Sequence, residues 1–289
     1  MTGGGRKRMR RSNYDQHAGQ PRPVATKHPR AEINARKAWV FENWCKQPRI
    51  ANVLNLGCGQ GGDALKIAKT VPPGSTVVNV DFSEPALTEF QSRVEAVAAL
   101  RNHNWLFSCK DVLDYELPSE LFARTHVVCC MLALHYFADT QPALTRFFQL
   151  VWDALAPGGV FVAVFPDAQV VRRHLLDAQP ISELYAEFTH EVFSIDARIQ
   201  DLDELRSGRA EAIPYNFTLD GTMTRVPETL LPDSVLIGAL ADAKLTLCES
   251  INLADVEAAD IRRSMGLHGR VSPSAQALLR LYKAIRVTK

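Results

Sequence analysis

A glycine-rich segment, VLNLGCGQGGD, spans residues 53–63 and is the clearest place in the chain where residue types and spacing could do chemistry. An apolar run with a strand pattern precedes the glycines and a helical pattern follows them, so they fall in a strand-to-helix turn. Gly57 and Gly59 lack a Cβ, which lets the backbone of the turn approach a ligand closely. In open α/β sheets, ligands bind beyond the carboxyl ends of the strands, where such a turn lies.

Two carboxylates follow at the ends of later apolar runs. Asp81 comes about twenty residues after the turn, where an acid can accept hydrogen bonds from both hydroxyls of a ribose. Asp111 ends the next run and could accept a hydrogen bond from an adenine amino group. Three strand ends therefore predict a nucleoside-binding site. A nicotinamide-dependent enzyme would share the first two features, but it would not require Asp111 or the later Pro157-Gly158-Gly159 turn.

Alternating strand and helix patterns must position these residues. Apolar runs predict strands at 51–57, 75–81, 104–111, 125–131 and 160–165, and helical spacing predicts helices at 35–44, 61–69, 83–100 and 140–155. Further strand candidates lie at 212–220 and 244–252, and residues 278–287 can end the sheet. The alternation predicts an α/β fold with a mostly parallel sheet flanked by helices. Because no Pro/Gly/Ser-rich linker interrupts the middle, we expect one domain over 21–289, with a helix and an insertion around 166–211.

Composition narrows the class of protein further. The 289 residues carry a formal net charge of +1, so any nucleic-acid binding must rest on a local basic patch. The six cysteines form no C-x-x-C pair and lie mostly in apolar runs, which favours buried thiols over structural zinc or disulfides. No apolar run is long enough to span a membrane, and the N-terminus lacks the apolar segment of a secretory signal.

The N-terminal residues 1–12 (MTGGGRKRMRRS) are rich in glycine and basic side chains. Their composition predicts a disordered basic tail over residues 1–20. The functional interpretations are a nuclear-import signal or an arm that holds nucleic acid. The alternative is a solvated tail with no role.

The glycine turn, the two strand-end acids and the Pro-Gly-Gly turn together resemble the S-adenosylmethionine-dependent methyltransferase superfamily. The resemblance implies a Rossmann-like methyltransferase fold with a late antiparallel strand, and S-adenosylmethionine as the cofactor. Asn55 stands where this superfamily usually carries an acid. An asparagine can still hydrogen-bond near the methionine amino group of the cofactor, but it supplies no negative charge there.

Four segments resemble a narrower family, the eukaryotic and viral mRNA cap guanine-N7 methyltransferases. Residues 42–46 (ENWCK) are similar to its asparagine-rich Trp-x-Lys segment, and residues 57–63 to its glycine loop, with Gln60 in place of a lysine. Ala133-Leu134-His135-Tyr136 resembles its His-Tyr pair, and YNFTLDG (215–221) followed by VPE (226–228) resembles its late strand and glutamate. Order and approximate spacing agree over residues 13–287.

The resemblance, carried over residue by residue, implies two sets of site residues. The set expected to line the cofactor site is Lys46, Asn55, Gly57, Gly59, Asp81, Asp111, Met131 and Tyr136, with Met131 in place of the family's glutamine. The set expected to face the cap guanine and its phosphates is Glu42, Asn43, Gln60, Lys66, Arg93, His135, Glu228 and Tyr282.

The chemistry of a cap independently suits these residue types. Guanine offers N1–H and an N2 amino group on one edge, and the carboxylate of Glu228 can accept hydrogen bonds from both. Aromatic faces such as those of Tyr136 and Tyr282 can stack on the base, and Lys66 and Arg93 can neutralise phosphate.

Each substrate residue also has a plainer interpretation. His135 can be a structural histidine, and Glu228 can begin a helix after a proline. Tyr282 can belong to the core, while Lys66 and Arg93 can be solvated helix faces.

Methyl transfer to N7 of guanine needs little from acid–base chemistry. The N7 lone pair is unprotonated at neutral pH, and a methyl group on a sulfonium is already an activated electrophile. We therefore expect no general base, no catalytic nucleophile and no metal. Rate would come from holding N7 in line with the methyl–sulfur bond.

Two other functions stay open at this point: a small-molecule methyltransferase on the same fold, and a non-catalytic RNA-binding subunit that has lost cofactor contacts at Asn55 and Met131. The expected partner is capped RNA (GpppN). A capping guanylyltransferase, the RNA polymerase tail and an activator subunit are further candidates, and no membrane is expected. The expected location is the nucleus, or the cytoplasm for a viral protein.

Overall fold

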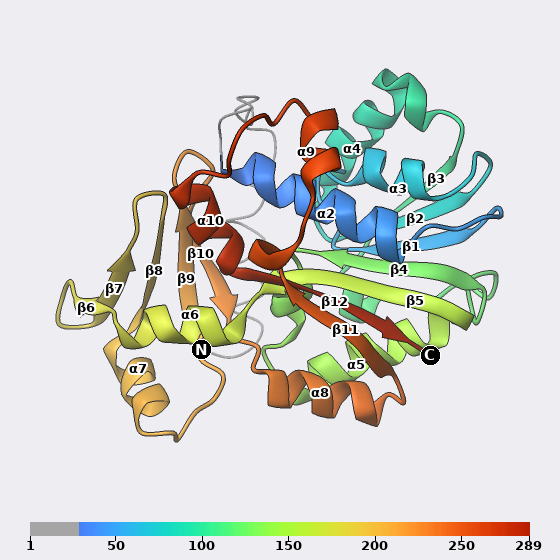
Figure 1. The fold of residues 1–289 in the computed structure, drawn as a ribbon. Coiled ribbons are helices and arrows are strands. Elements are labelled where there is room, and N and C mark those ends of the chain that lie inside the picture. The colour runs from blue at the N-terminus through green and yellow to red at the C-terminus, as the bar shows by residue number, and fades with distance from the viewer. Residues whose placement is uncertain (1–28) are drawn as a thin grey trace.

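A computed structural model describes residues 29–289, and its centre is a seven-stranded sheet with the order β11-β12-β5-β4-β1-β2-β3 (Figure 1). The strands are β1 (Asn52–Leu56), β2 (Thr76–Asp81), β3 (Asn104–Cys109), β4 (Thr125–Met131), β5 (Leu155–Pro166), β11 (Thr246–Asn252) and β12 (Tyr282–Thr288). β1 pairs in parallel with β2 and β4, whereas β12 runs antiparallel to β5 and β11. This topology confirms the predicted Rossmann-like α/β fold with a late antiparallel strand.

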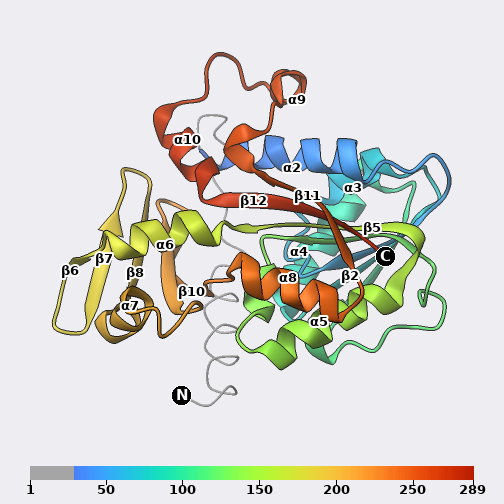
Figure 2. The ribbon, with the colours of Figure 1, turned by 60° about the horizontal axis from the view of Figure 1, so that its bottom comes forward.

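Helices cover both faces of this sheet, so the molecule has three layers (Figures 1 and 2). One face carries α2 (Arg30–Trp44), α3 (Ala64–Thr70), α4 (Glu84–Ala96) and α10 (Pro273–Arg280), and the other carries α5 (Gln141–Ala154) and α8 (Asp233–Asp242). Val53 and Leu54 of β1 point to opposite faces because side chains alternate along a strand. Val53 belongs to the apolar cluster that includes Phe41 of α2, and Leu54 belongs to the cluster that includes Phe147 of α5.

Short elements fill several connections between the layers: η1 (Ala98–Leu100), η2 (Val112–Asp114), η3 (Leu134–Phe137), η4 (Leu253–Asp255) and α9 (Ala259–Ser264). The helix expected over 83–100 is divided, because α4 ends at Ala96 and η1 follows. The run expected as a strand over 278–287 is also divided. Ser272 caps α10 by accepting a hydrogen bond from the Ala275 N–H, so that helix occupies the first part of the run and β12 the rest.

A second sheet, antiparallel and five-stranded, follows β5 in the chain. Its order is β10-β9-β8-β7-β6, with β6 (Gln179–Pro180), β7 (Tyr185–Thr189), β8 (Phe193–Arg198), β9 (Pro214–Leu219) and β10 (Met223–Thr229). The helices α6 (Ala168–Leu176) and α7 (Ile199–Arg206) accompany it. The insertion expected around 166–211 therefore extends further, because β9 pairs with β8 and β10 and not with the main sheet.

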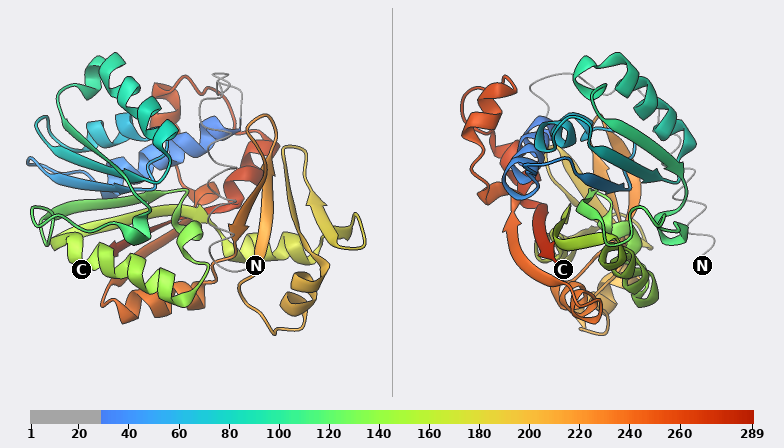
Figure 3. Two further views of the ribbon diagram at one scale, coloured as in Figure 1. Left: turned by 180° about the vertical axis from the view of Figure 1, so that it is seen from behind. Right: turned by 90° about the vertical axis from the view of Figure 1, so that its right-hand side faces the viewer.

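The second sheet lies beside the end of β5 and the start of β12, which is the carboxyl edge of the parallel strands (Figures 1 and 3). The division of the chain into one domain stays a prediction, and the tail predicted over residues 1–20 lies outside the described residues. Among residues 29–289, no helix is long and apolar enough to cross a membrane.

Candidate active site

The glycine turn follows β1 at the carboxyl edge of the main sheet. Gly57, Gly59 and Gly61 have φ angles of +67°, +52° and +71°, a left-handed backbone that favours glycine. A Cβ on Gly57 would lie 2.6 Å from Cβ of Ala133, and one on Gly61 would lie 2.2 Å from the Phe90 ring. Packing within the protein therefore requires glycine at both places, in addition to any ligand that approaches the turn.

Asp81 holds the glycine turn to the start of α4. Its Oδ2 accepts a hydrogen bond from the Gly59 N–H at 2.8 Å, and its Oδ1 accepts one from the Ser83 N–H at 2.9 Å. The carboxylate of Asp81 therefore fixes the position of the glycine turn relative to the end of β2. Asp111 caps η2 in a similar way, by accepting a hydrogen bond from the Leu113 N–H at 2.9 Å.

A buried lysine next to the glycine turn was missed in the sequence analysis. Lys37 Nζ lies 2.7 Å from Oδ2 of Asp63, the residue that precedes α3, and Lys66 Nζ lies 2.9 Å from Oδ1 of the same carboxylate. Burial lowers the pKa of Lys37 to about 8, because Asp63 offsets only part of the cost of burying the ammonium. Burial alone would raise the pKa of Asp63, but the two lysines outweigh it and hold that pKa below its usual value.

The available signal for Lys37 was helical spacing. Lys37 lies four residues after Ile33 and four before Phe41, both of which are buried, so it falls on the apolar stripe of α2. Burying a lysine ammonium on such a stripe costs free energy unless an acidic partner compensates for the lost hydration. A lysine in this position is therefore a candidate functional group.

Three predicted residues at the other end of α2 are not brought to the site. Glu42, Asn43 and Lys46 are exposed, and α2 ends at the opposite edge of the main sheet from the glycine turn (Figure 1). The Gln47 N–H donates a hydrogen bond to the carbonyl of Thr70, the last residue of α3, whereas the glycine turn precedes the first residue of that helix. The direction of α2 therefore contradicts the expectation that the cofactor or the cap is bound by Glu42, Asn43 and Lys46.

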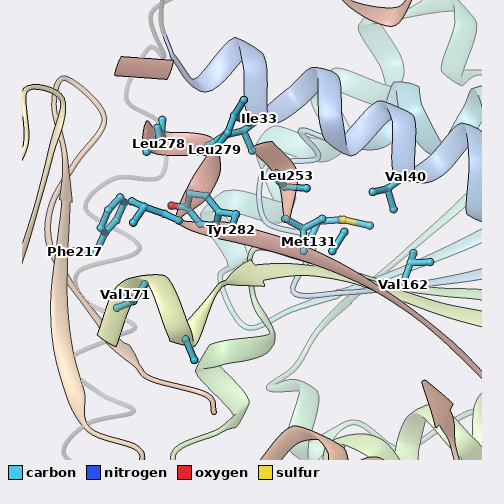
Figure 4. Packing of buried hydrophobic residues seen from close by; sticks show 14 of the residues in the cluster. Ile33, Val40, Met131, Val162, Val171, Phe217, Leu253, Leu278, Leu279 and Tyr282 are labelled. Atoms are coloured by element: carbon cyan, nitrogen blue, oxygen red, sulfur yellow. The ribbon is translucent and has the colours of Figure 1, made fainter. Parts of the chain in front are cut away.

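The polar side chain of Asn55 is used inside the sheet. Its amide donates to Oδ1 of Asn79 at 3.0 Å and accepts from the Cys129 thiol at 3.4 Å. These bonds link β4, β1 and β2, so they engage the amide with neighbouring strands instead of presenting it to a ligand. Met131, at the end of β4, is buried against the α2 side of the sheet near Val40 (Figure 4).

Three other residues predicted to bind the cap are either buried or engaged with neighbours. Gln60 is buried, and its Oε1 has no hydrogen-bond partner among the described residues. Lys66 also donates to the carbonyl of Gly62 at 2.9 Å. Arg93 lies in the last turn of α4 and forms an ion pair with Glu89 at 3.5 Å.

Four side chains from three distant segments meet where the second sheet joins the main sheet. We name His135, Tyr215, Glu228 and Tyr282 the second-sheet pocket; Tyr215, Glu228 and Tyr282 line one small cavity. Figure 4 shows Tyr282 at the start of β12 beside Phe217 of β9. His135 Nε2 lies 3.4 Å from Glu228 Oε1, and no good hydrogen bond to either ring nitrogen is formed by a residue of the range 29–289.

Each residue of the second-sheet pocket is at most 6% exposed. Glu228 lies in β10, five residues before α8 begins at Asp233, so it does not cap a helix. Tyr136 of η3 packs its ring on that of His135, with 4.1 Å between centroids, and connects the pocket with the turn after β4. The second-sheet pocket thus adjoins the carboxyl edge that carries the glycine turn. In the described part of the chain, no group of three or more His, Cys, Asp or Glu side chains could hold a metal ion.

The chain is similar to known proteins over most of its length. Residues 28–277 match the model of the mRNA (guanine-N(7))-methyltransferase domain. The chain is 28% identical over 211 residues to mRNA cap guanine-N(7) methyltransferase 1 of Arabidopsis thaliana, covering 68% of this chain and 55% of that protein. It is 27% identical over 252 residues to the protein of the same name from rice (Oryza sativa subsp. japonica), covering 79% and 66%. The chain thus spans between about half and two thirds of the length of these curated relatives.

Among solved structures, the CcbJ methyltransferase from Streptomyces caelestis is similar with a TM-score of 0.56 and 17% identity, covering 88% of this chain and 94% of that one. At this identity the likeness shows the fold alone. Because the domain match covers most of the chain, the chain belongs to the mRNA cap guanine-N7 methyltransferase family.

Proposed function

We propose that this protein transfers the methyl group of S-adenosylmethionine to N7 of the guanine in a GpppN cap. The observation that carries the proposal is the meeting of His135, Glu228 and Tyr282 beside the glycine turn. A cofactor site and a polar, aromatic pocket then share one edge of the sheet, as transfer between two bound molecules requires.

The residues at the carboxyl edge fit the proposed cofactor. Asp81 and Asp111 offer carboxylates for the ribose and the adenine, and the left-handed glycine turn follows the neighbouring strand at the same edge. Lys37 takes the place that the sequence analysis gave to Lys46, because a buried ammonium near the turn can pair with the carboxylate of the methionine moiety. We therefore propose Lys37, Gly57, Gly59, Asp81, Asp111, Met131 and Tyr136 as the cofactor site.

The second-sheet pocket suits the edge of a guanine. The carboxylate of Glu228 can accept hydrogen bonds from N1–H and the N2 amino group, a pair that adenine does not present. The rings of Tyr282 and Tyr136 can stack on the base, which for an exposed base contributes about 1–3 kcal/mol. Lys66 and Arg93 keep a weaker proposed role near the phosphates, because each already has an acidic partner.

The chain contributes orientation, not proton transfer, to the proposed reaction. Bound S-adenosylmethionine supplies a methyl group already activated by its sulfonium. N7 carries a free lone pair at neutral pH, so no side chain has to remove a proton. The pocket and the glycine turn need to hold N7 and the methyl carbon in line at about 3–3.5 Å, and that alignment lowers the entropic part of the barrier.

A direct assay tests this proposal. The protein is incubated with methyl-labelled S-adenosylmethionine and GpppG-capped RNA, and digestion then identifies the labelled nucleoside. We expect label in 7-methylguanosine of the cap and none in a matched RNA with a 5′ triphosphate. Label in a small-molecule acceptor but not in the cap would favour the small-molecule methyltransferase. Cofactor binding without any transfer would favour the non-catalytic subunit.

The same proposal includes capped RNA as the partner and the nucleus as the location. A capping guanylyltransferase, the polymerase tail and an activator subunit stay predictions, as does a role for the basic tail.

A further inference from the structure

A short hydrogen bond in the second-sheet pocket joins two residues that face each other across the β9–β10 pair. Tyr215 and Glu228 are direct cross-strand partners, and the Tyr215 hydroxyl donates to Glu228 Oε2 at 2.5 Å. The two residues are 3% and 6% exposed. Bonds from a neutral hydroxyl to an ionised carboxylate are short and strong, and burial strengthens them further.

This bond makes the two carboxylate oxygens of Glu228 unequal. Oε2 is turned into the sheet toward Tyr215, while Oε1 is turned toward His135, at a distance of 3.4 Å that leaves it open to a better donor. Burial, and after it the charge of Glu228, raises the pKa of Tyr215 well above its usual value. The phenol therefore keeps its proton, and with it the donor role, throughout the working pH range.

We propose that Tyr215 is a positioning residue that fixes which oxygen of Glu228 meets the edge of the substrate guanine. The inference rests on the proposed function and adds to it a determinant of guanine specificity. Tyr215 itself touches no reacting atom. It restricts rotation of the Glu228 carboxylate, so that Oε1 keeps one direction toward the N–H groups of the base.

The glutamine variant of Glu228 shows why the orientation matters. A phenolic O–H that is fully buried loses its partner if the amide turns its NH₂ group inward, so Tyr215 selects the amide oxygen for itself. The amide NH₂ group then faces the N1–H and N2–H groups of the guanine, so hydrogen-bond donors oppose one another and no bond can form. In Glu228→Gln, Tyr215 therefore holds the side chain in its worst orientation for the substrate.

The test is a double-mutant cycle on kcat/KM for a GpppG cap. Glu228→Gln should lower kcat/KM roughly 30- to 1,000-fold, and Tyr215→Phe alone about 3- to 10-fold, mainly through KM. The double variant Tyr215→Phe with Glu228→Gln should be about 3- to 10-fold more active than Glu228→Gln, because the amide can now turn its oxygen to the guanine. Removal of a merely structural tyrosine would lower activity again instead of restoring part of it.

Matched measurements keep the outcomes separate. Tyr185→Phe, on β7 of the same sheet, controls for loss of a phenol away from the pocket, and cofactor affinity and Tm are measured for every variant. Equal or lower activity of the double variant, with Tm and cofactor affinity retained, overturns the positioning role but leaves the proposed function intact. If wild-type protein fails to methylate the cap at all, the proposed function fails and the positioning role fails with it.

Discussion

The glycine turn and the second-sheet pocket are built in opposite ways. In the proposed cofactor site, the glycine turn and the carboxylates at the ends of adjacent parallel strands all lie within residues 57–111. The second-sheet pocket is formed by buried side chains of η3, the β9–β10 pair and β12, three segments that are far apart in the sequence. The cofactor side therefore follows from the fold that many methyltransferases share. We propose that substrate choice depends on the second-sheet pocket instead, because a shared fold does not determine a substrate.

Glu228→Gln is expected to have the largest effect on activity, and it tests whether the second-sheet pocket acts independently of the cofactor site. The change keeps the shape of the side chain but replaces an acceptor by a donor, and should cost about 2–4 kcal/mol in kcat/KM for a guanine cap. Cofactor affinity should barely move, because Asp81 and the glycine turn are untouched. Calorimetry and steady-state kinetics on one preparation check both, and weakened cofactor binding would show that the regions are not independent.

Asp81→Ala tests the comparison from the cofactor side. The ribose hydroxyls would lose a charged acceptor, which should cost about 1.5–3 kcal/mol in S-adenosylmethionine binding. The N–H groups of Gly59 and Ser83 would also lose their partner, so we expect Tm to fall as well. The matched control is Asp114→Ala, which removes an exposed carboxylate at the end of η2. Unchanged affinity by calorimetry would remove Asp81 from the site.

A comparison of Lys37→Met with Lys46→Met tests which of these two lysines contributes to cofactor binding. We expect Lys37→Met to weaken cofactor binding about tenfold, through loss of a charge-assisted hydrogen bond, and Lys46→Met to leave it unchanged. The opposite result would restore the position expected from the sequence.

The pH dependence of cofactor binding gives Lys37 a second test. Its pKa of about 8 in the folded protein means that the ammonium loses its proton as pH rises through that value. Wild-type affinity for S-adenosylmethionine should therefore fall faster above pH 8 than that of Lys37→Met, which has no such group. The cofactor amino group titrates equally in both variants, so only the difference between them is diagnostic.

The smallest expected effect concerns the basic residues 1–12. If they hold RNA, deleting them should raise KM a few-fold for capped RNA and less for a cap dinucleotide, and added salt should blunt the difference. Equal KM changes for both substrates would leave a targeting signal or a tail with no role.

The contrast between the two regions also explains what the sequence could predict. Strands and helices around the glycine turn follow from local periodicity, and Asp81 and Asp111 follow from the parallel register that brings strand ends together. The end of the insertion could not be predicted, because the sequence of β9 predicts a strand without indicating which of the two sheets that strand joins. That choice depends on long-range pairing with β8 and β10.

Lys46 was misplaced for a different reason. The motif ENWCK matches by residue type, but helix direction decides which end of α2 reaches the carboxyl edge. Lys37 lies two to three turns earlier and is the lysine that meets Asp63. The hydrogen bond from Tyr215 to Glu228 was equally out of reach, since it depends on the register of β9 and β10.

Competition between two caps tests the central claim most directly. Wild-type protein receives limiting labelled S-adenosylmethionine with an equimolar mixture of GpppG-capped and ApppG-capped RNA of the same sequence, and the labelled caps are separated after digestion. The account predicts label almost entirely in 7-methylguanosine from GpppG, because only its terminal guanine offers N1–H and N2–H to Glu228. Comparable labelling of both caps, or label on adenine, would contradict guanine recognition by the second-sheet pocket.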